Sequence, residues 1–209
     1  MNLPVASPTL RKLLEHWLAA VFVVVLFTFG VVADWVFHKR SRAELLLRSI
    51  TELRLGTSAF TEARELAQEY GGKSERGGSE RGCSAQACTF TFVIDNRPLN
   101  YIPGVRGVRF VAAIGVKDGY VTSREVDYAI MNSTDLDFMY TVLDHLESAK
   151  GLEVRKLNLD PMGRPHILKV TLGRSATADE RQRAFSIQLS CFARLRGCND
   201  AAAVFSSGL

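Results

Sequence analysis

A run of hydrophobic residues near the amino terminus, Trp17–Phe37, is the strongest pattern in the chain. Between residues 18 and 33 there is no charged side chain and no Asn, Gln or His. Because a helix rises about 1.5 Å per residue, Trp17 and Trp35 would lie about 27 Å apart, one at each interface of a bilayer. A buried core helix is the alternative, but such helices are usually amphipathic and this run is apolar on every face. The sequence therefore predicts a transmembrane anchor at 17–37, after a short N-terminal tail at 1–16.

A basic cluster follows the apolar run directly. Lys39, Arg40 and Arg42 are placed where their side chains would reach the headgroups of anionic lipids. We therefore predict that these three residues form the membrane interface together with Trp17 and Trp35, and that the lipid bilayer is one partner of the protein. The positive-inside rule, taken alone, would place the domain that follows this basic flank in the cytoplasm.

The four cysteines favour the opposite orientation. They form two local pairs, Cys83 with Cys88 and Cys191 with Cys198, a spacing typical of two small disulfide loops in an oxidising compartment. Zinc binding is a competing interpretation, although structural zinc sites favour tighter spacings such as C-x-x-C, and four reduced thiols are a third. An apolar run so near the amino terminus is also typical of an export signal-anchor. We therefore expect a single-pass protein of the bacterial inner membrane with an extracytoplasmic C-terminal domain.

Cleavage of the apolar run is an alternative to its retention. Val31, Val32 and Ala33 satisfy the small-residue preference of signal peptidases, after a basic region and an apolar region. The apolar run continues through Phe37, however, and its uncharged core is longer than most signal-peptide h-regions. Retention as an anchor is therefore predicted.

Two helices are predicted between the anchor and the first strand. Residues 38–56 would continue the anchor as a juxtamembrane stalk helix that ends at Gly56. One face of that helix would carry Leu45, Leu46, Ser49, Ile50 and Leu53. A packing helix is predicted at 59–70, with Thr57-Ser58 as its N-cap. Residues 71–87 contain a tandem Ser-Glu-Arg-Gly repeat without apolar side chains, so a flexible loop is expected there.

From Cys88 onward, the hydrophobic period changes from helical spacing to alternation, which is typical of half-buried strands. Strands are predicted at 89–94, 105–116, 120–130, 152–159, 166–172 and 185–191. Asp118-Gly119 predicts a type I′ hairpin turn between the second and third of these, because both central positions of that turn need positive φ. Residues 177–183 are polar and are expected to form a helical turn.

The hydrophobic pattern of residues 135–150 fits both the spacing of a helix and the alternation of a strand. Leu136, Met139 and Leu143 fit a helix, whereas Phe138 and Val142, with Tyr140 between them, fit a strand. We favour the helix, with Ser133 or Thr134 as its cap. The sequence as a whole then predicts an α+β fold: a single N-terminal transmembrane helix, a stalk and a packing helix, and a mostly antiparallel β-sheet within an extracytoplasmic domain at 57–209.

Residues 53–58, Leu-Arg-Leu-Gly-Thr-Ser, precede a helix that carries Glu62 and Ala63, and predicted strands follow. This arrangement resembles the opening helix pair and strand meander of the small outer-membrane-assembly lipoproteins of the SmpA/OmlA type. The resemblance covers about a third of the chain. The lipobox cysteine of that family is absent and the domain is longer, so no functional residue is carried over.

Charge and motifs exclude several kinds of chemistry. The formal net charge of +4 is mild and spread along the chain, whereas nucleic-acid binders usually gather basic residues and aromatics on one stripe, so no nucleic-acid partner is expected. The motifs H-E-x-x-H, G-x-S-x-G and G-x-G-x-x-G do not occur. His145 beside Asp144 lacks a nucleophile and an orienting partner, and Asp127, Asp135 and Asp137 do not lie in a calcium-type loop. No catalytic residue, metal ligand or cofactor is therefore predicted.

Two classes of function remain. The anchor and the lack of a recognisable site favour a membrane-anchored, non-catalytic interaction or scaffold module of the cell envelope, with a protein partner in the membrane or envelope. The alternative is an extracytoplasmic small-ligand-binding domain or enzyme whose site is built from residues remote in sequence. A deep pocket with convergent polar groups would favour that alternative.

Overall fold

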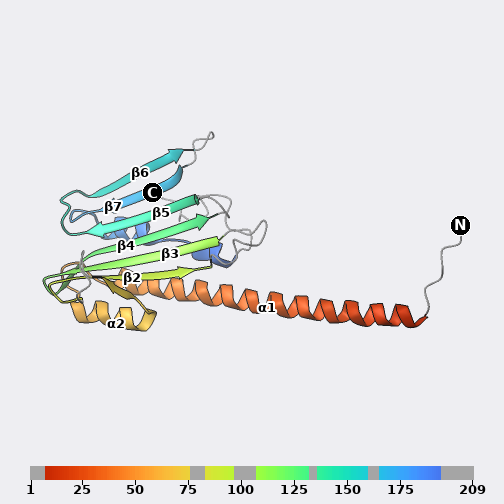
Figure 1. The fold of residues 1–209 in the computed structure, drawn as a ribbon. Coiled ribbons are helices and arrows are strands. Elements are labelled where there is room, and N and C mark those ends of the chain that lie inside the picture. The colour runs from red at the N-terminus through yellow and green to blue at the C-terminus, as the bar shows by residue number, and fades with distance from the viewer. Residues whose placement is uncertain (1–7, 76–82, 97–106, 132–135, 160–164, 194–209) are drawn as a thin grey trace.

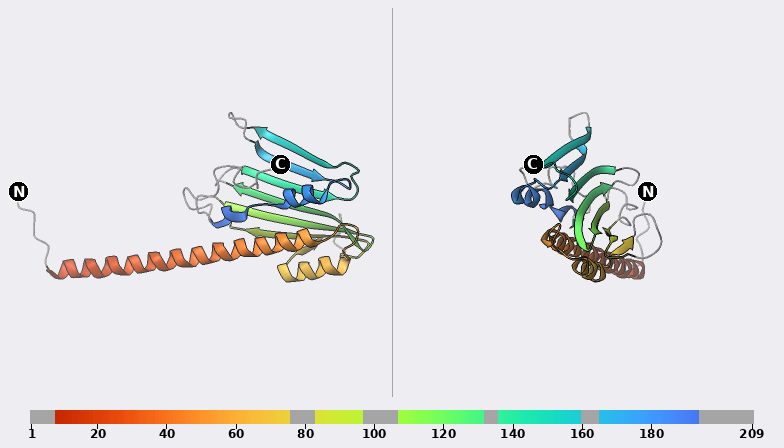
Figure 2. Two further views of the ribbon diagram at one scale, coloured as in Figure 1. Left: turned by 180° about the vertical axis from the view of Figure 1, so that it is seen from behind. Right: turned by 90° about the vertical axis from the view of Figure 1, so that its left-hand side faces the viewer.

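One long helix and one β-sheet dominate the structure (Figure 1), a computed structural model that describes residues 8–75, 83–96, 107–131, 136–159 and 165–193. Helix α1, Pro8–Glu52, is 45 residues long and unbroken. Its N-terminal part extends away from the rest of the molecule, and its C-terminal part lies along the sheet (Figures 1 and 2). The predicted anchor and the predicted stalk are therefore two parts of one continuous helix.

The sheet has seven strands in the order β1-β2-β3-β4-β5-β7-β6. The strands are β1 (Lys73–Glu75), β2 (Ala87–Asp95), β3 (Gly107–Lys117), β4 (Tyr120–Met131), β5 (Leu136–His145), β6 (Leu152–Leu159) and β7 (Pro165–Leu172). All neighbours pair antiparallel except β5 and β7, which pair in parallel because β6 lies outside β7. The predicted α+β fold with a mostly antiparallel sheet is confirmed.

One hydrophobic core fills the space between the sheet and the helices. Helix α2 (Phe60–Tyr70), helix α3 (Ala178–Phe185) and the 3₁₀-helix η2 (Leu189–Ala193) all contribute to it, together with the end of α1. Its largest fully buried side chains include Phe92, Phe110, Tyr128, Tyr140 and Phe192. The alternating burial along β2–β5 assigns one face of the sheet to this core, as the alternating sequence pattern predicts.

The stalk is part of the domain core. Ala43, Leu46 and Ile50 of α1 are fully buried, and Leu53 just beyond the helix is nearly so. The predicted face was correct at Leu46, Ile50 and Leu53, but Leu45 is half exposed because the sheet contacts a face centred on residues 43, 46 and 50. Helix α1 ends at Glu52, before the predicted stop at Gly56, which adopts a positive φ of 76° in the following turn.

Local signals place the turns well and the caps less well. Asp118 and Gly119 have φ of 52° and 87°, which fits the predicted type I′ hairpin turn. The N-cap of α2 is Ala59 instead of the predicted Thr57-Ser58, because Glu62 accepts a hydrogen bond from the Ala59 N–H at 3.1 Å. Ser58 Oγ instead accepts from Arg54 N at 3.1 Å. Within the predicted loop 71–87, Lys73–Glu75 pair with β2 as strand β1.

Two predicted elements were wrong. Residues 136–145 form strand β5, not a helix, because Phe138, Tyr140 and Val142 are buried on one face between β4 and β7. The predicted last strand at 185–191 is absent: α3 runs to Phe185 and η2 follows. The capping box of Thr177 and Glu180 begins α3 and explains the helical start of this segment. The apolar side chains of residues 185–191 are nevertheless buried, as a half-buried strand there would also require.

Candidate functional site

The exposed part of α1 carries most of the large apolar side chains that are exposed among the described residues. Every side chain from residue 14 to residue 31 is exposed, a length of about 27 Å at 1.5 Å per residue. Among the described residues, α1 is the one helix long and apolar enough to cross a membrane by length and composition. The first buried side chain along the described part of α1 is Val36, which lies inside the predicted anchor at 17–37, so the folded domain begins within the last turn of that run and no linker separates the two.

The predicted interface residues divide between two roles. Trp17 is exposed at one end of the apolar run, and Trp35 lies at the other, with the Lys39 ammonium 5.6 Å from its ring centroid. Arg40 pairs with Glu44 on the next turn at 2.7 Å. Arg42 donates from Nη2 to the carbonyl oxygen of Tyr70 at 2.9 Å, where α2 ends. Arg42 therefore holds α2 against α1.

The first cysteine pair forms a disulfide that organises the end of the sheet farthest from the exposed helix. Cys83 and Cys88 are bonded, with Cα atoms 4.9 Å apart. Between them, the carbonyl oxygens of Gln86 and Ala85 accept hydrogen bonds from Asp118 and Gly119 of the β3–β4 turn, at 3.2 and 2.7 Å. The disulfide loop therefore supports that turn. Cys191 is also disulfide-bonded, and Cys198 lies outside the described residues.

A buried ion-pair cluster lies where α1 ends on the sheet. Arg124 of β4 donates from Nε and Nη2 to Asp144 Oδ2 at 3.1 and 2.9 Å. Its Nη1 donates to the carbonyl oxygens of Ile50, Thr51 and Leu53, at 3.1, 2.8 and 2.9 Å. The carbonyls of Ile50 and Thr51 belong to the last turn of α1, where they have no partner within the helix and form the negative end of its dipole, and Leu53 follows directly after the helix. One guanidinium therefore joins the end of α1 to the sheet.

A second arginine completes this cluster from α3. Arg181 donates from Nε to Asp144 Oδ2 at 3.2 Å, from Nη2 to the Gly173 carbonyl at 2.7 Å, and from Nη1 to the Ala176 carbonyl. The Phe185 ring packs against the Arg124 guanidinium, with 4.8 Å between the ring centroid and Cζ. Asp144 is completely buried and is balanced by two cations.

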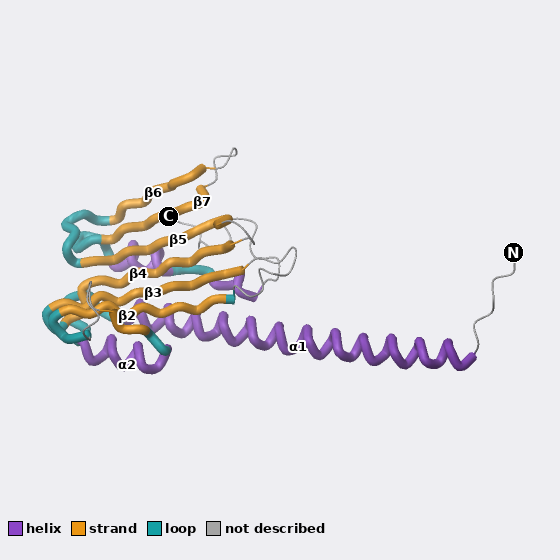
Figure 3. Tube along the Cα trace, in the orientation of Figure 1, coloured by secondary structure: helices purple, strands orange, loops and turns teal. Residues whose placement is uncertain are grey.

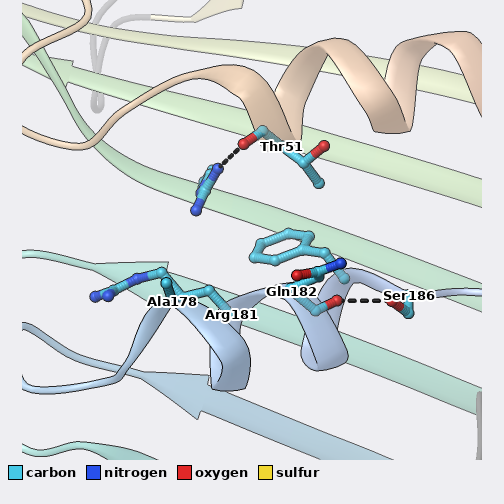
Figure 4. A pocket seen from close by; sticks show the side chains of 7 residues that line it. Thr51, Ala178, Arg181, Gln182 and Ser186 are labelled. Atoms are coloured by element: carbon cyan, nitrogen blue, oxygen red, sulfur yellow. Dashed lines mark hydrogen bonds between the residues drawn. The ribbon is translucent and has the colours of Figure 1, made fainter.

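A pocket of about 410 Å³ opens beside this cluster. Its walls are Thr51, Arg124, Ala178, Arg181, Gln182, Phe185 and Ser186. Figure 4 shows Thr51 at the end of α1 on one side and the α3 residues on the other. Each guanidinium nitrogen of both arginines already donates to an acceptor of the chain, so the polar groups of this pocket serve the fold first.

The candidate catalytic and metal-ligating residues do not converge. Asp144 faces the core while its neighbour His145 points to the opposite face, as alternation along a strand requires. Asp127 lies on that opposite face, where it accepts a 2.6 Å hydrogen bond from Thr141. Asp137 is near His166, whose Nδ1 lies 2.8 Å from the Asp137 carbonyl oxygen, and Asp135 is outside the described residues. Within the described ranges, no three His, Cys, Asp or Glu side chains could hold a metal ion together.

Two carboxyl groups lie on the open face of the sheet, the face away from the helices. Glu125 and Asp127 follow one another along β4 on this face. Partial burial raises the pKa of both, and their mutual repulsion adds to the effect at Glu125. Lys169 lowers the pKa of both groups, and Arg109 and the Thr141 hydroxyl lower that of Asp127, but burial prevails. The two carboxyl groups are therefore partly desolvated on this face, and neither of them lines the pocket beside the ion-pair cluster.

Sequence reasoning singled out Asp144 but missed Arg124 and Arg181. The sequence did carry a signal for Arg124, because alternation along its strand places it on the same face as the inward residues Val126, Tyr128 and Ile130. Arg181 lay in a polar segment without such a signal.

Comparisons with protein-family models, with curated proteins and with solved structures found no protein that matches this chain.

Proposed function

We propose that the protein is a membrane-anchored, non-catalytic interaction or scaffold module of the cell envelope. The observation that carries this proposal is the continuity of α1, which exposes an apolar run at one end and forms part of the domain core at the other. Because no break separates the two parts, the anchor sets the position and the orientation of the domain at the membrane. A module that works by holding a binding surface in place needs this arrangement.

The proposal places the C-terminal domain outside the cytoplasm, on the bacterial inner membrane. The Cys83–Cys88 disulfide supports this side, because cytosolic thiols are kept reduced. The basic residues after the span oppose it. A C-terminal alkaline phosphatase fusion should be active in a bacterial host; an inactive fusion, with an active cytoplasmic reporter at the same position, would place the domain inside.

The role of the anchor can be tested by releasing the domain. A cleavable signal peptide joined to Asp34 removes the exposed run and keeps Val36 and all the buried side chains that follow. The released domain should fold but fail to complement a deletion strain, because tethering supplies the effective concentration near the partner. As a control, an unrelated apolar span of equal length should restore complementation. Full complementation by the released domain would contradict the proposal.

A small-ligand receptor or enzyme is the second candidate, favoured by the pocket between α1 and α3. Gln182 and Thr51 line this pocket, and their side chains take no part in the ion-pair cluster, to which Thr51 contributes only its backbone carbonyl. Gln182→Ala and Thr51→Ala should therefore leave the fold intact. Under the module proposal, both variants complement fully. If either abolishes function while its unfolding temperature is unchanged, a ligand in this pocket is the better interpretation.

A further inference from the structure

Strand β6 forms an open edge of the sheet. It is eight residues long and pairs antiparallel with β7 from Leu152 to Leu159, while among the described residues no strand pairs with its other side (Figure 1). Alternate N–H and C=O groups of an antiparallel strand point away from its one neighbour, so this edge offers a row of backbone donors and acceptors. Val154 and Leu157 are 38% and 45% exposed beside it.

The usual protections of an edge strand are largely missing here. Residues 152–157 contain no proline, and their register with β7 runs without a bulge from Leu152 opposite Leu172 to Leu157 opposite Ile167. The opposite edge of the sheet is different, because β1 has three residues. The remaining protection of β6 is its charge, at Arg155 and Lys156. Positive charge repels basic strands and attracts acidic ones.

The charge around this edge is strongly one-sided. The described residues from Lys150 to Ser175 include five basic side chains and one acidic side chain, an excess equal to the net charge of +4 of the whole chain. They are Lys150, Arg155, Lys156, Lys169, Arg174 and the acidic Glu153. Glu153 is shared between Arg155 at 2.6 Å and Lys150 at 3.8 Å. The sequence analysis described the net charge as spread along the chain, but its excess is concentrated at this edge. This edge therefore complements an acidic partner.

A second copy of the chain does not fit this edge. Helix α1 runs along the direction of the strands (Figures 2 and 3), so an anchor that crosses a bilayer sets the strands along the membrane normal. Antiparallel pairing of two β6 strands needs a two-fold axis perpendicular to the sheet, and this axis would point the two anchors in opposite directions. Parallel pairing keeps the anchors aligned but sets Arg155 and Lys156 of both copies side by side, where like charges are destabilising.

The geometry points to β6 as the docking site for an extended, acidic segment of a partner protein, which adds to the sheet as an eighth strand. This inference rests on the proposed function, because it names the surface that the anchor holds in place. The backbone of the partner pairs with the outer groups of β6, and its carboxylates meet Arg155 and Lys169, which lie opposite each other on the open face of the sheet. Backbone pairing supplies the affinity and the basic side chains select acidic segments.

The test uses the full chain in detergent and a synthetic peptide, acetyl-Thr-Val-Glu-Val-Asp-Val-Glu-Thr-amide. We expect it to bind at least about tenfold more tightly than the same peptide with Lys at the three acidic positions, and to slow hydrogen exchange of amides within residues 152–157. The double variant Arg155→Glu/Lys156→Glu should reverse the preference between the peptides. Arg48→Glu/Arg54→Glu, with the same change of charge at two exposed residues outside β6, should bind within about twofold of the wild type.

The contrary results are equally distinct. Binding without protection of residues 152–157, equal binding of both peptides, or a peptide-free dimer that protects these amides would each overturn the inference. The proposed function is judged separately by the released domain: if that domain fails to complement and the peptide does not bind, the module stands and β6 is not its surface. If the released domain complements and the peptide binds, the docking site at β6 is supported and the proposed role of the anchor is contradicted.

Discussion

Arg124 and Asp144 lie directly opposite each other on β4 and β5, and their side chains form a buried ion pair with Nη2 and Oδ2 2.9 Å apart. The same guanidinium binds three carbonyl oxygens at the end of α1. The pair therefore fixes the sheet to the helix that carries the apolar run, as well as β4 to β5.

Replacement of Arg124 by Met should be strongly destabilising. It leaves the Asp144 charge with Arg181 alone and leaves the last carbonyls of α1 without a donor, so we expect a loss of about 3–5 kcal/mol in the free energy of unfolding. Denaturant unfolding of the full chain in detergent measures this loss. Arg48→Met, at an exposed position of the same helix, is the matched control and should change stability by less than about 0.5 kcal/mol. Equal effects of the two changes would show that the cluster does not hold the helix.

The two buried tyrosines should respond differently to loss of their hydroxyl groups. Tyr140 donates to the Ala184 carbonyl at 2.7 Å, whereas the Tyr128 hydroxyl is buried without a hydrogen-bond partner among the described residues. Tyr140→Phe should therefore cost about 1 kcal/mol, and Tyr128→Phe should leave stability unchanged or increase it. Thermal unfolding of both variants at pH 7 tests this. A larger loss at Tyr128 than at Tyr140 would contradict it.

Loss of the disulfide at Cys83 and Cys88 should have a modest effect. The bond joins residues five apart, and so short a loop removes little entropy from the unfolded chain, so Cys83→Ser/Cys88→Ser should cost about 2 kcal/mol. Unfolding of the wild type and the variant, both without reductant, measures the difference, because the bond at Cys191 stays intact in both. Peptide mapping without reduction tests the pairs: Cys83 or Cys88 joined to Cys191 or Cys198 would contradict local pairing.

Glu125 and Asp127 should make stability depend on pH. Burial raises the pKa of each above its ordinary value of 4.5 or 3.8, so the folded state holds these protons more tightly than the unfolded chain does. Their contribution to folding is therefore favourable at low pH and is lost as the pH rises through the raised pKa values. Glu125→Gln/Asp127→Asn should unfold at nearly the wild-type temperature at pH 4 and at a higher temperature at pH 8. A difference that stays constant with pH would be contrary to this expectation.

Much of the fold could be predicted from the sequence, because local signals and burial agreed. The alternation along β2, β3 and β4, the Asp118-Gly119 turn and the apolar run of α1 were each visible in the order of residues. The helix prediction at 135–150 failed because both periods fit that segment, and pairing with β4 and β7 decided the outcome.

That error hid the pairing of Arg124 with Asp144 in the ion-pair cluster. As a strand, 136–145 places Asp144 on the same face as Tyr140 and Val142, and the inward parity of β4 places Arg124 there too. The register that sets the two residues opposite each other depends on strand pairing and could not be read from either segment alone. The parallel placement of β7 and the exposed position of β6 likewise follow from packing between distant segments.

The position of α1 in the core also determines the order of events during synthesis. The whole of α1 leaves the ribosome before the strands do, yet Ile50 meets Arg124 only after 74 further residues have been added, and the core closes on Phe192 later still. The apolar run of α1 is available for insertion throughout that interval. If the apolar run is the anchor that we propose, biogenesis separates into two stages: the helix inserts first, and the strands made later assemble on a helix face that is already held at the bilayer surface.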